Sequence, residues 1–149
     1  MRTRPTLKFT PWMSWEHRRR YKSGRMAGIY IVAISKKGLD GKRPSWADVS
    51  YIGMTNSAGG LLSRWHQFDI AIHGGGRHSG GRTIFKDLGD YKHWKKRLLV
   101  AACALKCNVV KKTRTAADLM QMGWIAFLEY NALAECRRVI GREPKYNTK

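Results

Sequence analysis

Two short runs of β-branched and aromatic residues constrain the fold more than any other feature of the sequence. One is GIYIVAIS at residues 28–35, and the other is VSYIGM at residues 49–54. Runs of this length and composition are typical of β-strands. The segment between them, residues 36–48, holds two glycines and a proline, which mark turns. The sequence therefore predicts an antiparallel hairpin with a long tip.

Each run also carries a tyrosine that the core of a sheet does not need. Phenylalanine buries as well as tyrosine, whereas a buried phenol must find a hydrogen-bond partner. Tyr30 and Tyr51 are therefore candidates for a chemical role.

Two segments show the apolar spacing of helices. Residues 58–73 repeat leucine, isoleucine and aromatic side chains at helical intervals, and residues 115–141 form the longest helical pattern. The longer segment begins with Thr115 and Asp118, which resemble an N-terminal capping box, and closes at Gly141.

The remaining pattern completes one small domain. Residues 97–105 are largely apolar, which predicts a third strand that is buried on both faces. Residues 74–82, GGGRHSGGR, predict a flexible basic loop. We expect this loop and residues 36–48 to be mobile, because glycine, lysine and arginine dominate both and few apolar side chains anchor them. The sequence predicts an α/β (α+β) fold without repeats or a second domain.

The composition excludes several classes of protein. With 149 residues and 43% hydrophobic residues, the chain can bury a proper core. No apolar run approaches the ~20 residues that span a bilayer, and the N-terminus lacks the apolar core of a secretory signal. Cys103, Cys107 and Cys136 match no zinc spacing. They are typical of reduced core thiols, which favours a cytoplasmic location.

The charge indicates a partner. The chain has 29 lysines and arginines against 10 acidic residues, a formal net charge of +19. A domain this basic suits a polyanion, most commonly nucleic acid. The alternative is a solubilising surface, although such surfaces usually mix both signs. A membrane surface is disfavoured, because no long helix has a basic face opposite an apolar one.

Residues 1–26 form a basic and aromatic arm ahead of the domain at residues 27–149. Eight lysines and arginines stand against one acid, interleaved with four aromatic residues. The arm could hold DNA phosphates with its cations, or its rings could cover the core. An arginine-rich transit peptide is a third interpretation. The cations assigned to DNA in this arm are Arg18, Arg19, Arg20 and Lys22.

Two charged residues interrupt apolar helix faces. Glu129 lies among Ile125, Ala132 and Leu133 on the long helix, and Arg64 has apolar neighbours on the first helix. A charge in such a place is costly unless it meets a partner. One interpretation is a buried salt bridge between the two. The other, which the scarcity of carboxylates favours, is that Glu129 binds a divalent metal and Arg64 faces a phosphate.

Together these residues resemble the ordered motif set of the GIY-YIG endonuclease superfamily. The set comprises Gly28-Ile29-Tyr30, Tyr51-Ile52-Gly53, Arg64 on the following helix, Glu129 on a later helix and Asn147 near the end. Either tripeptide alone is weak evidence, whereas all five parts in the right order are strong. The match covers about residues 27–148, nearly everything except the arm.

The resemblance implies a three-stranded antiparallel sheet flanked by helices, and metal-dependent cleavage of phosphodiesters in double-stranded DNA. It also implies residue roles. Tyr30 would help to activate the attacking water, and Tyr51 would assist at the scissile phosphate. Arg64 would neutralise that phosphate, and Glu129 would bind Mg²⁺ or Mn²⁺. Asn147 would brace the site from the C-terminal tail.

The chain departs from the family pattern in two places. Twenty residues lie between Tyr30 and Tyr51, so residues 36–48 resemble an insertion. Many members also carry a histidine or tyrosine one turn after the helix arginine, where this chain has Phe68. The catalytic role of that group is assigned to His78 in the glycine-rich loop, with an exposed loop histidine as the alternative.

The subtype of the enzyme stays open at this point. A restriction-type or phage or mobile-element endonuclease, encoded by a bacterium or phage and acting in the cytoplasm, is the favoured expectation. A structure-specific repair nickase and an inactive nucleic-acid-binding module are the alternatives, and a homodimer is possible. Specificity is expected from the arm, from residues 36–48, or from residues 74–82 with Arg77 and Arg82 on the DNA.

Overall fold

The structure is a computed structural model that describes residues 4–148. Its strands are β1 (Met13–Ser14), β2 (Ala27–Ile34), β3 (Tyr51–Thr55) and β4 (Leu98–Leu105). Its α-helices are α1 (Gly60–Ile72), α2 (Ser79–Leu88) and α3 (Ala116–Ile140). Short 3-10 helices lie at Trp15–Arg20, Trp46–Asp48, Tyr91–His93 and Lys95–Arg97.

The four described strands form one antiparallel sheet in the order β1-β4-β2-β3. The predicted hairpin is confirmed as β2 and β3, in a register that sets Tyr30 opposite Gly53. The predicted third strand is confirmed as β4, which lies between β1 and β2. The α+β class is therefore as the sequence predicts.

The prediction of three strands is wrong by one. The arm contributes β1, whose residues Met13 and Ser14 pair with Val100 and Leu99 of β4. A strand of two residues is too short to show an alternating pattern, so the sequence gives no signal for it. The fourth strand is identified only by its pairing with the edge of β4 in the structure.

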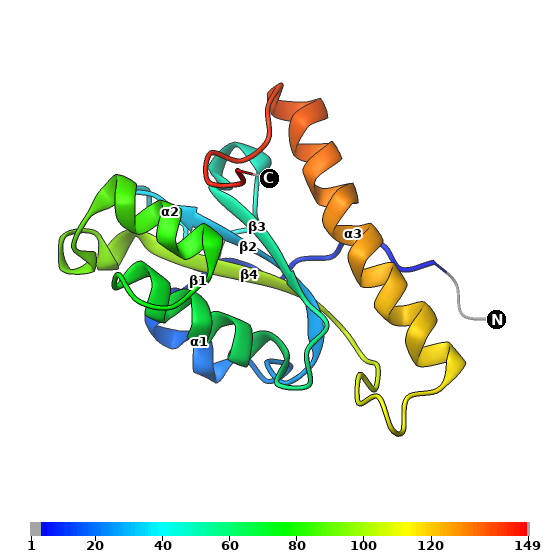
Figure 1. Cartoon of the computed structure of the whole chain (residues 1–149). Coiled ribbons are helices and arrows are strands. Elements are labelled where there is room, and N and C mark those ends of the chain that lie inside the picture. The colour runs from blue at the N-terminus through cyan, green and yellow to red at the C-terminus, as the bar shows by residue number, and fades with distance from the viewer. Residues whose placement is uncertain (1–3, 149) are drawn as a thin grey trace.

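The sheet separates two layers of helices, as Figure 1 shows, with α1 and α2 on one face and α3 on the other. Successive residues of β2 point to opposite faces. Ile29 and Ile31 belong to the core beneath α3, whereas Tyr30 and Val32 belong to the core beneath α1 and α2. This alternation directs the Tyr30 phenol towards α1 and α2.

The arm is part of the packed domain. The side chains of Trp12 and Trp15 are each only 1% exposed, and they belong to opposite cores of the sheet. The structure therefore supports the interpretation in which the aromatic residues of the arm cover the core.

The segment of residues 36–48 is anchored by the same arm. Trp12 donates its backbone N–H to the Lys42 carbonyl and accepts from the Gly41 N–H. Leu39 is buried in the core beneath α3. Few apolar anchors were expected here, and Leu39 provides one because it belongs to the same core as Trp12 of the arm.

The prediction of a flexible loop over residues 74–82 is wrong for the second half of this segment. Residues 79–82 form the first turn of α2, with Gly80 and Gly81 buried. Glycine is unfavourable in the interior of a helix, so the sequence of this segment does not predict one. Close packing is the reason for the glycines, because a Cβ on Gly81 would lie 2.6 Å from the Ala71 Cβ of α1.

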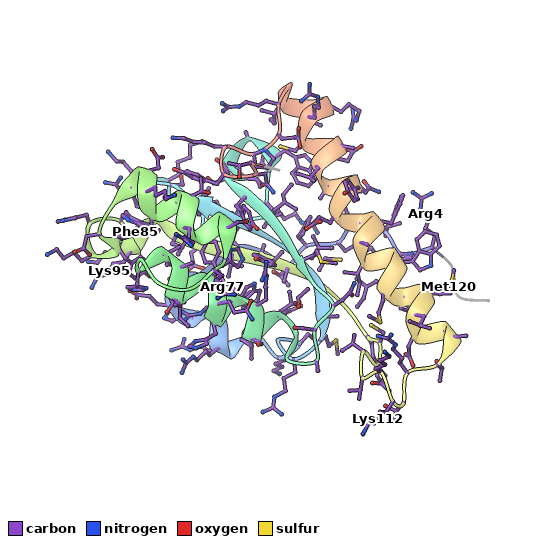
Figure 2. The ribbon with its side chains drawn as sticks, viewed as in Figure 1. Arg4, Arg77, Phe85, Lys95, Lys112 and Met120 are labelled. Atoms are coloured by element: carbon purple, nitrogen blue, oxygen red, sulfur yellow. The ribbon has the colours of Figure 1, made fainter. Side chains whose placement is uncertain are left out.

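The longest helix begins and ends as predicted. Thr115 and Asp118 form a reciprocal capping box at the start of α3, and Gly141 takes a left-handed conformation with φ of 88° at its end. Arg4 lies over the Phe127 ring on this helix, at 4.0 Å from the ring centre (Figure 2). Within residues 4–148, none of the helices has the length and apolar character that crossing a bilayer requires.

Replacing Trp12 with alanine tests the structural role of the arm. We expect the Trp12→Ala substitution to lower the free energy of unfolding by about 3–5 kcal/mol, because it leaves a cavity in the core. Urea unfolding monitored by circular dichroism measures the loss. The exposed arm residue Arg19 provides the control, and its substitution by alanine should change stability by less than about 0.5 kcal/mol. A small effect at Trp12 would contradict a structural arm.

Candidate active site

Tyr30 lies at the centre of β2 with its side chain fully buried. Its hydroxyl lies 2.9 Å from Nε2 of His78, which satisfies the phenol inside the core. Burial raises the pKa of Tyr30 well above its ordinary value, and the neighbouring Tyr51 adds to the rise. The phenol is therefore neutral at pH 7 in the free protein.

His78 caps the N-terminus of α2, and its side chain is buried. Its Nδ1 accepts a hydrogen bond from the Gly81 N–H at 3.1 Å. In a neutral imidazole the other nitrogen then carries the proton, so Nε2–H donates to the Tyr30 oxygen. Burial, with the charge of Arg64 as a second cause, lowers the pKa of His78 to about 4. The imidazole is thus neutral at pH 7 and held in one tautomer.

Two glycines make room for the tyrosine rings. A Cβ on Gly53 would lie 2.5 Å from the Tyr30 hydroxyl, because the Tyr30 ring crosses the paired strand at this position. A Cβ on Gly80 would meet the Tyr51 ring at similarly short range. The glycine in Tyr51-Ile52-Gly53 is therefore required by the packing of the other tyrosine.

Tyr51 begins β3, the edge strand beside β2. Its ring centre lies 6.1 Å from that of Tyr30 and 5.7 Å from that of His78. Phe68 of α1 packs edge-on against the imidazole, with the two ring centres 5.1 Å apart. The four rings form one aromatic cluster around the buried hydroxyl.

Arg64 of α1 influences four titratable groups around it. Burial raises the pKa values of Tyr30 and Tyr51, and the guanidinium charge opposes both rises. Burial also raises the pKa of Glu129, which the same charge opposes. At His78 the charge acts with burial to lower the pKa. One cation therefore connects two phenols, an imidazole and a carboxylate from separate elements.

The guanidinium is only partly paired. Its Nη1 donates to Gln67 Oε1 at 2.8 Å, whereas its buried Nε has no hydrogen-bond partner within the described chain. An unpaired buried donor is costly, and a bound anion would satisfy it. No ion pair between Arg64 and Glu129 occurs in residues 4–148, so the salt-bridge interpretation is not supported.

Glu129 of α3 is half-buried, and its carboxylate lines a cavity of about 240 Å³. The same cavity is lined by Tyr51, by Ser79 of α2 and by Asn147. A larger depression of about 810 Å³ lies between the end of β4 and the start of α3, and none of the candidate residues line it. The smaller cavity is therefore the one relevant to the candidate chemistry.

Asn147 lies in the tail, which we define as residues 141–148. Its side chain makes two hydrogen bonds to the backbone of Ile52, accepting from the N–H at 2.8 Å and donating to the carbonyl at 2.9 Å. These bonds satisfy the outward edge of β3 next to Tyr51. The structure thus places Asn147 as a brace of the strand that carries the second tyrosine.

The residues assigned to DNA from the sequence are distributed over two regions. Arg18 is engaged internally, 3.5 Å from Asp69 and over the Trp15 ring at 4.4 Å. The other cations are exposed. They are Arg19, Arg20 and Lys22 after β1, Arg82 in the first turn of α2, and Arg77 in the connection between α1 and α2 (Figure 2).

The available residues fit a metal that protein and substrate hold together. Mg²⁺ prefers oxygen ligands and is commonly bound by one or two carboxylates with substrate phosphates and waters. Glu129 offers one carboxylate beside the cavity, free of ion pairs within the described chain. Residues 4–148 contain no group of three or more His, Cys, Asp or Glu that could hold a metal alone.

No protein-family model matches the chain, and neither does a curated protein or a solved structure.

Sequence reasoning missed two contributors to this site. Gly80 makes room for Tyr51, but the residue lies in a segment without a visible helical pattern. Asp87 binds the tail through Tyr146 Oη at 2.6 Å, across 59 positions in sequence. The spacing of Ile84 and Leu88 is the one signal that could have revealed α2.

Replacing Gly53 with alanine tests the packing of Tyr30. We expect the Gly53→Ala substitution to destabilise the protein by about 1–3 kcal/mol, because the ring must move to admit a methyl group. The control is Gly38→Ala, since a Cβ on Gly38 meets no atom within 4 Å. Urea unfolding of both variants gives the comparison. Equal stability of the two variants would contradict the close contact.

The buried neutral imidazole predicts a pH dependence of stability. Between the ordinary pKa of 6.5 and the folded value of about 4, the unfolded chain binds a proton that the folded chain does not. The free energy of unfolding therefore falls as pH falls through this window, by up to about 3 kcal/mol, and levels off below it.

The His78→Asn substitution isolates this contribution, because asparagine is also a favourable helix cap. We expect the variant to lose less stability than the wild type between pH 7 and pH 4.5 in urea titrations. His66→Asn, at an exposed position of α1, is the matched control and should retain the wild-type slope. An unchanged slope in His78→Asn would show that folding does not lower the pKa of this imidazole.

Proposed function

We propose that this chain is a metal-dependent endonuclease that hydrolyses phosphodiester bonds of double-stranded DNA, with a GIY-YIG type of active site. The observation that carries the proposal is the convergence around Arg64. The phenol of β2 contacts the imidazole that caps α2, the phenol of β3 lies beside both rings and lines one cavity with the carboxylate of α3, and the Arg64 charge influences the pKa of all four groups. A cation with an unpaired buried donor at that point suits a phosphate.

Tyr30 has the role of orienting the attacking water. In the free protein the phenol is neutral, because burial outweighs the charge of Arg64 in setting its pKa. The oxygen receives a hydrogen bond from His78 Nε2–H, since Nδ1 is occupied by Gly81. A phenol that keeps its own proton orients the attacking water by donating a hydrogen bond to it, while the imidazole holds the phenol oxygen in place. His78 is thus a donor, and it is not the base that removes the proton of Tyr30.

Arg64 and Tyr51 act on the phosphate. The guanidinium offsets charge on the phosphate oxygens, and the Tyr51 hydroxyl donates a hydrogen bond from the wall of the cavity. Glu129 would hold Mg²⁺ or Mn²⁺ together with the bound phosphate. When bound, the metal polarises the phosphate and stabilises charge on the leaving oxygen. Asn147 keeps the edge strand in place.

The charge of the chain supports DNA as the substrate. A net charge of +19 favours a polyanion, and the exposed cations Arg19, Arg20, Lys22, Arg77 and Arg82 are free to contact phosphates. Arg18 is less suited, because Asp69 and Trp15 already hold it. Residues 4–148 hold one such candidate cluster, so cutting both strands requires two events or two copies, as in a homodimer.

Incubation of the full chain with supercoiled plasmid tests this function. We expect cleavage in Mg²⁺ or Mn²⁺ that EDTA abolishes, with gel electrophoresis and sequencing of the ends as readouts. Defined ends indicate a site-selective enzyme, and nicks alone indicate a nickase. Binding without cleavage in either metal would contradict the enzyme and favour a nucleic-acid-binding module.

The Glu129→Gln substitution tests the metal assignment. We expect it to abolish cleavage and to leave the Kd for DNA within about twofold, because it removes a metal ligand and no phosphate contact. Glu135→Gln is the matched control on the same helix, since Glu135 pairs with Arg138 on the exposed surface. Cleavage by Glu129→Gln at the wild-type rate in Mg²⁺ would show that Glu129 holds no metal.

A further inference from the structure

The tail follows the edge of β3 on both sides of Tyr51. Tyr146 donates its backbone N–H to the Ser50 carbonyl at 3.0 Å, and Asn147 binds both backbone groups of Ile52. The residues immediately before and after Tyr51 are thereby tied to the tail. The position of Tyr51 on this edge consequently depends on where the tail lies.

A second contact fixes the tail to the C-terminal turn of α2. Oδ2 of Asp87 accepts from the Tyr146 hydroxyl at 2.6 Å and lies 3.1 Å from Nζ of Lys145. The Tyr146 ring is buried in the core beneath α1 and α2. The hydrogen bond from Tyr146, and then the contact with Lys145, hold the pKa of Asp87 below its usual range. We call this three-residue contact the latch.

The other end of α2 reaches the candidate site directly. His78 caps that end and binds Tyr30, and Gly80 lies against the Tyr51 ring. The cavity beside Glu129 has walls from both partners of the latch, because Ser79 comes from α2 while Tyr146 and Asn147 come from the tail. Within residues 4–148, the side chains of the latch therefore link these two walls of the cavity.

We propose that Asp87 and Tyr146 are positioning residues for the candidate active site. These two residues join α2 to the tail. Gly80 of α2 lies against the Tyr51 ring, and the tail is hydrogen-bonded to β3 on both sides of Tyr51, so the link fixes the position of Tyr51. Neither residue touches the reacting atoms. The inference rests on the proposed function for its catalytic consequence, whereas the mechanical link stands on the contacts alone.

Three variants separate the parts of the latch. Tyr146→Phe removes the hydroxyl and keeps the buried ring. Asp87→Ala removes the acceptor, and Asp87→Asn keeps a carbonyl oxygen that accepts from Tyr146 without pairing with Lys145. Tyr130→Phe is the matched control, because this phenol lines the same cavity but is exposed and lies outside the latch.

Amide hydrogen exchange of the intact protein measures the mechanical link. We expect the amides of Ile52 and Tyr146 to exchange about 10–100-fold faster in Tyr146→Phe and Asp87→Ala, because a hydrogen bond to a charged group is lost. Asp87→Asn should lie closer to the wild type. The Ala101 amide in the centre of the sheet should be unchanged in every variant. Wild-type exchange at Ile52 in Asp87→Ala would overturn the proposal.

Single-turnover cleavage of plasmid in Mg²⁺ measures the catalytic consequence. We expect at least a tenfold slower rate in Asp87→Ala and Tyr146→Phe with an unchanged Kd for DNA, and partial recovery in Asp87→Asn. Faster exchange with a wild-type cleavage rate would overturn the positioning role. A wild-type protein that cleaves nothing would overturn the proposed function alone, and hydrogen exchange would still decide whether the latch holds Tyr51.

Discussion

The hydroxyl of Tyr30 is completely buried, and a phenol in that place is stable only with a hydrogen-bond partner. His78 supplies the partner, and it can do so because it caps the start of α2 and its Nδ1 is engaged by the Gly81 N–H. The ring fits only because the opposite residue of β3 is Gly53. The start of a helix, the register of a hairpin and the glycine at position 53 are thus all coupled to one buried tyrosine.

The rest of the candidate site is assembled around this centre from distant parts of the chain. α1 brings Arg64 to one side, and α3 crosses the opposite face so that Glu129 reaches the cavity at the sheet edge. The tail then closes the edge through Asn147. A rigid antiparallel sheet suits this arrangement, because each phenol is fixed by its strand and does not rely on a loop for its position.

Several features were predictable because the residues that determine them are close together. The β2–β3 hairpin follows from two strand-forming runs and turn residues, and the bounds of α3 follow from Thr115, Asp118 and Gly141. The buried Tyr30 and the partly buried Arg64 were also identifiable, because a polar group among apolar neighbours is visible without a structure. Strand β1 and helix α2 were not, since two residues carry no pattern and glycine-rich segments favour a loop prediction.

The sequence by itself determined the α+β class, the hairpin, the capped long helix and the set of polar residues that need partners in the core. Only the tertiary structure decided which partners they found. It paired Tyr30 with His78, left Glu129 without an ion pair to Arg64 among residues 4–148, and joined Asp87 to Tyr146. The physical reason is that local propensity acts over a few residues, whereas these contacts join positions 48 and 59 apart in sequence and form only when two helices and the tail pack on one sheet.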